Sequence, residues 1–235
     1  MLLTLAGCCS SGPEQLNDPD PDVRREALAC LADDDPDQAT ELAGALIAEA
    51  EEPDPALRAT ALRVLGVLEG KRWSDSVAAV LVGDDERASD RNARVRQEAA
   101  STLGRLRTGM EALAQSVRTD PDPEVRWSAA DALARGGADD PQSLEALISA
   151  LDDASHPVRL TARRSLRQLT RTDQGTSASA WRTWLEESAR EPASEDEGEV
   201  YEDEVYEDPP AEDPPAEDPP AEDPPAEDDP GDGGQ

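Results

Sequence analysis

The chain has 235 residues and a formal charge of −32, because 54 Asp and Glu outnumber 22 Lys and Arg. Residues 191–235 hold 20 of the acidic residues and no basic one, so residues 1–190 carry −12. This charge argues against binding nucleic acid or anionic lipid through the surface at large, and the absence of Phe leaves too little bulky apolar volume for a β-sandwich or barrel core.

The N-terminal residues 1–12 are predominantly apolar and read MLLTLAGCCSSG. Leu5-Ala6-Gly7-Cys8 resembles a bacterial lipobox, in which the cysteine after the cleavage site receives a lipid. The resemblance implies attachment at Cys8 without a membrane-spanning segment. Seven residues precede Cys8 and none is Lys or Arg, so a working signal peptide requires an upstream start codon. We expect a lipid-anchored protein on the periplasmic side of the cell envelope or, with a chance apolar terminus instead, a cytoplasmic protein.

Residues 13–190 contain a repeated motif, V/L-R-x-x-A-x-x-x-L. It begins at Val23, Leu57, Val95, Val125 and Val158, at spacings of 34, 38, 30 and 33 residues, which is typical of stacked two-helix repeats. Within each motif the V/L, Ala and Leu share one helical face, and the small Ala allows a neighbouring helix to approach. We therefore expect these alanines to be buried: Ala27, Ala61, Ala99, Ala129 and Ala162.

A residue able to cap a helix lies three positions before each V/L of the motif. A short side-chain oxygen at this position accepts a hydrogen bond from an otherwise unpaired amide of the first turn. In three repeats the next residue is Pro, which suits the first helical position. The predicted N-caps are Asp20, Asp54, Asn92, Asp122 and Ser155.

Weaker apolar segments with helical spacing separate the motifs and predict the first helix of each hairpin. They begin at Ala39, Ser74, Met110 and Ser143, whereas the first motif lacks such a partner and predicts an incomplete repeat. Gly70 and the pair Gly136-Gly137 stand where a helix should stop, so we expect left-handed C-terminal caps there.

The segments DPDPDVRREALACL and DPDPEVRWSAADAL resemble the second helix of bacterial HEAT-like repeats, and the resemblance covers residues 18–170. It implies an all-α, right-handed α-solenoid of about five helical hairpins. It also implies that the Arg after each V/L bonds to acidic or carbonyl groups of the adjoining turn, or alternatively contacts a ligand. This predicted ladder is Arg24, Arg58, Arg96, Arg126 and Arg159.

The third repeat departs from the pattern, because Asn92-Ala93 replaces Asp-Pro and the longer segment GDDERASDRN precedes it. This loop is either mobile or a binding loop. The closing segment LRQLTRTDQGTSASAWRTWLEE is similar to the ends of many bacterial HEAT-repeat proteins, in which a Trp-x-x-Trp helix seals the last repeat. Trp181 and Trp184 share a helical face and are expected to form this cap, with an exposed aromatic peptide clamp as the alternative.

The last motif helix is rich in arginine on the side opposite its apolar residues. We predict either a solvated face or a basic patch screened by the acidic C-terminal segment, formed by Arg163, Arg164, Arg167 and Arg171.

Residues 191–235 contain an EDPPA array without any aliphatic residue larger than Ala in the array itself. Such a segment cannot bury enough surface to offset its ordering entropy, so we predict a disordered, extended tail. It serves either as a spacer or as an electrostatic hook for a basic partner. The predicted organisation is a tether over 1–12, a repeat solenoid with its cap over 13–190 and the tail over 191–235.

No arrangement typical of catalysis is found, since the only histidine, His156, precedes Pro157 in a predicted turn, and three cysteines cannot form a four-ligand zinc site. We therefore expect a non-enzymatic, monomeric interaction scaffold without cofactor, metal or nucleic acid, which binds an unidentified protein or peptide over its solenoid surface. The alternatives are an envelope protein that acts mainly through its lipid and acidic tail, or an enzyme resembling the phycobilin lyases that share HEAT-like repeats.

Overall fold

The computed structural model describes residues 13–48, 54–84, 88–136 and 140–190, all within the unit that extends to Pro192. These residues form helices and no strand. The helices that carry the motif, called the motif helices, are α1 (Pro21–Asp34), α3 (Pro55–Val67), α5 (Ala93–Leu106), α7 (Pro123–Leu133) and α9 (His156–Thr170). The partner helices are α2 (Pro36–Ala48), α4 (Ser74–Val82), α6 (Met110–Thr119) and α8 (Pro141–Ala150). The remaining elements are α10 (Ala178–Arg190) and two 3₁₀ helices, η1 (Pro13–Asn17) and η2 (Lys71–Trp73).

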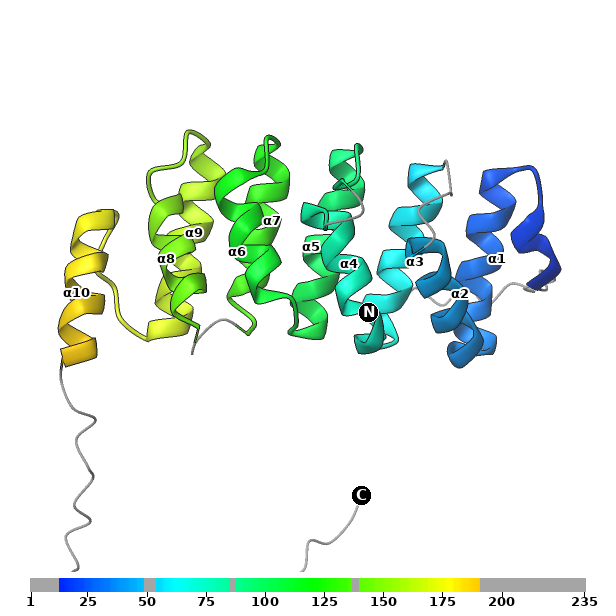
Figure 1. Cartoon of the computed structure of the whole chain (residues 1–235), viewed down its shortest axis with the longest axis horizontal. Coiled ribbons are helices and arrows are strands. Elements are labelled where there is room, and N and C mark those ends of the chain that lie inside the picture. Colours follow the sequence, from blue (N-terminus) through cyan, green and yellow to red (C-terminus); the bar gives the residue numbers. More distant parts are fainter. Residues whose placement is uncertain (1–12, 49–53, 85–87, 137–139, 191–235) are drawn as a thin grey trace, which may run out of the picture. The chain divides into compact units, whose positions relative to one another are not determined.

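The helices form two layers, and within each layer the helices follow one another in chain order (Figure 1). Each motif helix packs on the motif helix of the next repeat, and the partner helices α2, α4, α6 and α8 contact one another in the same order. Each partner helix also packs on the motif helix that follows it. The all-helical repeat architecture predicted from the motif is thereby confirmed.

The first repeat is incomplete, as its sequence predicts. No α-helix precedes α1 in the described residues, and the short η1 packs against it instead. Because a repeat buries its apolar face only against a neighbour, a short element of this kind protects the open side of α1.

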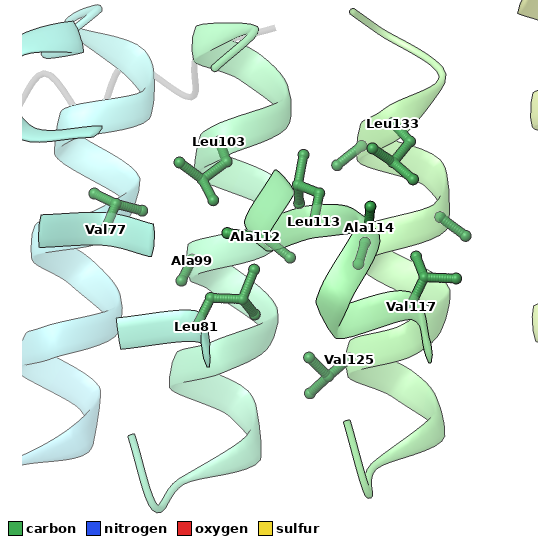
Figure 2. Close-up of a cluster of buried hydrophobic side chains, with 14 of the residues drawn as sticks. Val77, Leu81, Ala99, Leu103, Ala112, Leu113, Ala114, Val117, Val125 and Leu133 are labelled. Carbon is green, nitrogen blue, oxygen red and sulfur yellow. The ribbon is translucent and has the colours of Figure 1, made fainter. Parts of the chain in front are cut away.

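The five motif alanines are buried, each with at most 1% of its surface exposed. Figure 2 shows this core in the third and fourth repeats, where Ala99 of α5 lies among Leu81, Leu103 and Leu113. A methyl group at the alanine position lets the next helix approach closely, while the leucines fill the space between the layers. The expected seam of small and branched side chains is confirmed.

Two glycines show how closely the helices approach. A Cβ on Gly104 of α5 would lie 2.7 Å from the Cβ of Ala132 in α7, and one on Gly44 of α2 would overlap the indole ring of Trp73. A side chain at either position therefore requires a neighbour to move.

Two predicted helix ends differ from the structure. Gly70 has φ −67°, so it is not left-handed; Glu69 before it has φ 55° and makes the turn, while the Gly70 N–H donates to Leu65 O. Gly136 also lacks a positive φ, and Gly137 lies outside the described residues. Because α7 already ends at Leu133, its chain turns before the glycine pair is reached.

Three further predictions fall outside the described residues: the tether over 1–12 with Cys8, the disordered tail over 191–235, and the middle of the third-repeat loop at 85–87. Cys30 is buried in α1.

Candidate interaction surface

Four of the predicted N-cap side chains cap their motif helices. Asp20, Asp54, Asn92 and Asp122 each accept a hydrogen bond from a backbone N–H of the first helical turn. Ser155 occupies the N-cap position of α9, but its hydroxyl makes no capping bond. Its own N–H donates to Asp153 Oδ1 at 2.7 Å, so Ser155 is held by the preceding aspartate.

The arginine after the motif V/L links successive repeats. Arg58 donates through Nε and Nη2 to the carboxylate of Asp90, at 2.7 and 3.0 Å. Arg96 makes the same two-bond contact with Asp120, at 2.8 Å for both bonds. The pair of parallel bonds fixes the guanidinium more firmly than a single contact.

Arg126 continues the series with Asp153, through bonds of 2.7 and 2.9 Å. Each acceptor belongs to the turn that precedes the next motif helix. The predicted contact with acidic groups of a turn is therefore present, and the turn is that of the following repeat.

Each of these aspartates connects three parts of the chain. Asp120 accepts from Arg96 of the preceding motif helix, and its Oδ1 also accepts from the N–H of Asp122 at 2.9 Å. Its backbone carbonyl accepts from Nη1 of Arg126 at 2.9 Å. Asp90 and Asp153 make the equivalent bonds. Their carboxylates accept from the N–H of Asn92 and of Ser155, and their carbonyls accept from Nη1 of the next ladder arginine.

These aspartates are not among the residues predicted from the motif, although the sequence contains a signal for them. Each lies two residues before an N-cap, so the pattern is D-x-[DNS] followed three residues later by V/L-R. It occurs at Asp18, Asp90, Asp120 and Asp153. A carboxylate at this spacing can accept from the N-cap amide while its other oxygen faces the neighbouring repeat.

The two end arginines, like Arg96 and Arg126, bond to the turn before their own helix. Nη1 of Arg24 donates to the carbonyls of Asp18 and Pro19, at 2.8 and 3.3 Å. Arg159 donates through Nη1 to the carbonyls of Asp153 and Ala154, at 2.7 and 3.0 Å. Both therefore brace the turn before their own helix.

The ladder contacts change the acidity of their members. The hydrogen bonds that Arg96 donates to Asp120 raise the pKa of Arg96, and those that Arg126 donates to Asp153 raise the pKa of Arg126. Burial alone would raise the pKa of Asp153, but the bonds from Arg126 and from the Ser155 N–H outweigh it and lower that pKa below its usual range. These groups stay charged at neutral pH and act as structural links, so their donors are already used within the chain.

The arginines of the predicted basic patch on α9 are exposed but partly paired with acidic side chains. Arg163 donates to Asp173 at 2.7 Å, and Arg167 lies 3.3 Å from the same carboxylate. Arg164 pairs with Asp131 of α7. The hydrogen bond with Asp173 raises the pKa of Arg163, while that bond and the Gly175 N–H lower the pKa of Asp173.

The position of Arg163 explains why arginines gather there. The equivalent residues in the earlier motif helices are Leu28, Leu62, Ala100 and Ala130, which are all buried. No motif helix follows α9 in the described residues, so this side is exposed and carries polar residues, as expected for a terminal repeat.

A groove of about 300 Å³ lies beside the longer loop of the third repeat, between the ends of α4 and α6. Its walls include Ser89, Arg91, Arg96 and Asp120, together with Ser116, whose buried hydroxyl has no partner in the described structure. Both Arg96 and Asp120 are already used in the ladder. The ladder therefore already uses the buried charged pair of this groove.

The Trp-x-x-Trp helix closes the end of the solenoid. Trp181 is completely buried and its indole N–H donates to Gly175 O at 3.0 Å, while Trp184 packs edge-on against it with 5.8 Å between ring centroids. Because α10 packs on α8, the two rings cover the end of the partner layer. This arrangement is that of a cap, and Trp181 is not exposed to a peptide.

The described part of the chain holds no group of three or more His, Cys, Asp or Glu residues arranged to bind a metal. His156 lies at the start of α9, with its Nδ1 3.3 Å from Nη2 of Arg159. None of the described helices has the combined length and apolar character needed to span a bilayer.

A family model for HEAT repeats matches the chain over residues 14–87, 85–167 and 110–195. Comparison with curated proteins gives no significant match. The matched ranges cover most of the chain. They include every described helix, apart from the first residue of η1. The chain therefore belongs to the HEAT-repeat family.

Proposed function

We propose that this protein is a non-enzymatic scaffold of the bacterial cell envelope that binds a protein partner over its repeat surface. The HEAT-repeat architecture supports an interaction role, because stacked repeats present an extended surface on a rigid backbone. The lipobox-like sequence at Cys8 supports the envelope location.

The observation that carries the proposal is the exposed side of the motif layer. The ladder arginines are directed into the turns, but other arginines of the same helices, such as Arg63 and Arg164, keep more than half of their side-chain surface exposed. Arginine is enriched at binding hot spots, and a row of such residues on packed helices is held ready for contact.

Crosslinking and mass spectrometry on cells that express the full-length chain test this function. We expect partner peptides crosslinked to residues of the described helices, and the Cys8→Ala variant should lose membrane fractionation. A full-length chain that yields no partner crosslinks would contradict the scaffold role. A Cys8→Ala variant that still fractionates with membranes would contradict the lipid anchor alone.

A second candidate is an envelope tethering protein that acts mainly through its lipid and its acidic C-terminal segment. The 20 acidic residues without a base in residues 191–235 favour this role. Pull-down with residues 1–190 and with residues 191–235 separates the two functions, because the scaffold predicts that the partner is retained by the first fragment.

A further inference from the structure

The exposed side of the motif helices carries an ordered row of arginines. Residues five and nine places after the ladder arginine lie on this side, since a spacing of four returns to the same helical face. The row and its two acidic neighbours, called the arginine face, comprise Arg63, Glu98, Arg105, Asp131, Arg135 and Arg164.

Ion pairs make the arginine face continuous from one helix to the next. Arg63 of α3 lies 4.0 Å from Glu98 of α5, and Arg164 of α9 pairs with Asp131 of α7. Between them, the hydroxyls of Ser101 in α5 and Ser128 in α7 are hydrogen-bonded at 3.0 Å. The side chains of four successive motif helices therefore meet along this face.

Two of the arginines lie close to glycines of the preceding motif helix. A Cβ on Gly66 of α3 would lie 3.1 Å from Nη1 of Arg105, and one on Gly104 of α5 would lie 2.8 Å from Nη1 of Arg135. Each guanidinium therefore extends over the backbone of its neighbour. Ordering these long side chains before binding reduces the entropy lost when a partner binds.

The arginine face has an excess of positive charge in a domain that is otherwise acidic. Each of its two acids is shared by two arginines: Glu98 by Arg63 and Arg105, and Asp131 by Arg135 and Arg164. The four arginine side chains are 41 to 63% exposed, whereas the side chains of Glu98 and Asp131 are 22 and 26% exposed. The more accessible charge is therefore the positive one.

Exposed apolar residues lie in the same register. Val67 follows Arg63 by four residues and Leu160 precedes Arg164 by four, and they are 58 and 54% exposed. They are the large hydrophobic residues that the described helices expose most. Their position beside arginines suits a partner that brings both carboxylates and apolar side chains.

We propose that the arginine face binds an extended Asp- and Glu-rich segment of a partner protein, with Val67 and Leu160 contacting its apolar residues. This inference rests on the proposed scaffold function and assigns its surface and the chemistry of its partner. A peptide can place carboxylates at the arginines and avoid Glu98 and Asp131. A nucleic acid is disfavoured because its closely spaced phosphates cannot avoid these acids or the −12 charge of residues 1–190.

Fluorescence anisotropy with the full chain at low salt tests the proposal. The probe is a labelled peptide of repeated Glu-Asp-Leu-Ser, and its uncharged control is repeated Gln-Asn-Leu-Ser. The variant Arg63→Gln/Arg105→Gln/Arg135→Gln/Arg164→Gln should bind the acidic peptide at least about tenfold more weakly. The matched control, Arg72→Gln/Arg118→Gln/Arg182→Gln/Arg190→Gln, changes the net charge equally outside the motif layer and should change affinity less than about twofold.

A variant with the opposite effect keeps the test decisive if the fourfold variant is poorly folded. Glu98→Gln/Asp131→Asn removes the two acids of the face and should strengthen binding of the acidic peptide by about threefold or more. No binding by the unmodified chain, or equal losses in the two arginine variants, would overturn the proposal. An oligonucleotide that binds more tightly than the peptide through the same arginines, or self-association through them without peptide binding, would also overturn it.

Cell crosslinking with the fourfold variant separates this inference from the scaffold function. Loss of partner crosslinks in this variant, with retention in the matched control, supports both. If crosslinks persist in the fourfold variant, the arginine face is wrong and the scaffold function stands. If the unmodified chain gives none, the scaffold function itself fails.

Discussion

The arginines in the middle of the ladder and the last ladder arginine make different contacts. Arg96 and Arg126 each hold a carboxylate of the following repeat with two bonds and also bond a carbonyl of their own turn. Arg159 keeps the contacts with its own turn, but no following repeat supplies a carboxylate to it within the described residues. Arg96 and Arg126 therefore join repeats because the next repeat supplies an aspartate to each.

The end of the stack relies on a different kind of contact. Trp181 buries a large ring against the last repeat, whereas the middle of the molecule joins its repeats through small alanines and charged pairs. The contrast predicts that changes at the end should loosen the last repeat by itself, while changes in the middle should uncouple two halves of the stack.

The largest expected effect comes from removing the terminal ring. Trp181→Ala should destabilise the last repeat by about 4 kcal/mol, because it leaves a cavity and an unpaired Gly175 carbonyl. Hydrogen exchange should accelerate in α8, α9 and α10 and remain slow in α3 and α5. Trp184→Ala, at a half-buried position, is the control and should have a smaller effect. Equal acceleration along the whole stack would contradict a local capping role.

The second largest loss of stability is expected when a central ladder contact is removed. Asp120→Ala removes both carboxylate bonds of Arg96, whose side chain is 9% exposed, and should cost about 3 kcal/mol. Arg159→Gln at the end of the ladder should change the free energy of unfolding by no more than about 0.5 kcal/mol. Urea unfolding of the two variants measures both values. Similar losses would show that the bonds to the turn, rather than the carboxylate of the next repeat, provide the stabilisation.

The sequence could predict the local part of this structure. Helix starts, N-caps and buried alanines depend on residues within one or two turns, so Asp54 and Ala61 were found from their own motif. Ser155 shows the limit, because it stands at the N-cap position of α9, but Pro157 in the first turn has no N–H to donate and the Ser155 hydroxyl makes no capping bond.

The contacts between repeats were harder to predict. Asp131 and Asp173 neutralise part of the predicted basic patch, and Asp131 is 33 residues away from Arg164 in the sequence. The helical wheel of α9 alone does not show which residues of the preceding repeat reach it. The predicted left-handed cap at Gly70 is wrong for another reason. A glycine permits a positive φ but does not fix which residue adopts it, and here Glu69 does.

A third prediction compares the same position of the repeat motif in a central motif helix and in the last one. Eight residues after the ladder arginine stand Gly104 in α5 and Arg167 in α9. Gly104→Ala should cost about 1.5 kcal/mol despite the better helix propensity of Ala, since its Cβ would meet Ala132. Arg167→Ala should stay within about 0.5 kcal/mol, because no motif helix packs there. Thermal unfolding measures both, and a stabilised Gly104→Ala variant would contradict the close approach of α5 and α7.

The smallest expected effect concerns acid stability. The lowered pKa of Asp153 means that its pairing with Arg126 stabilises the fold fully above the ordinary aspartate pKa of about 4, and that this stabilisation is lost as the pH falls through the lower pKa of the folded state. Asp153→Asn should therefore lower stability at pH 7 and reduce the loss between pH 5 and pH 2 by about 1 kcal/mol.

Asp173 at the end of the stack provides the comparison, since its pKa is also lowered but its carboxylate is accessible to solvent. Salt screens exposed charges more strongly than buried ones. The effect of Asp173→Asn on acid stability should therefore disappear at high salt, while that of Asp153→Asn should persist. If both effects vanish together in acid titrations at low and high salt, the middle of the ladder is no better shielded from water than its end.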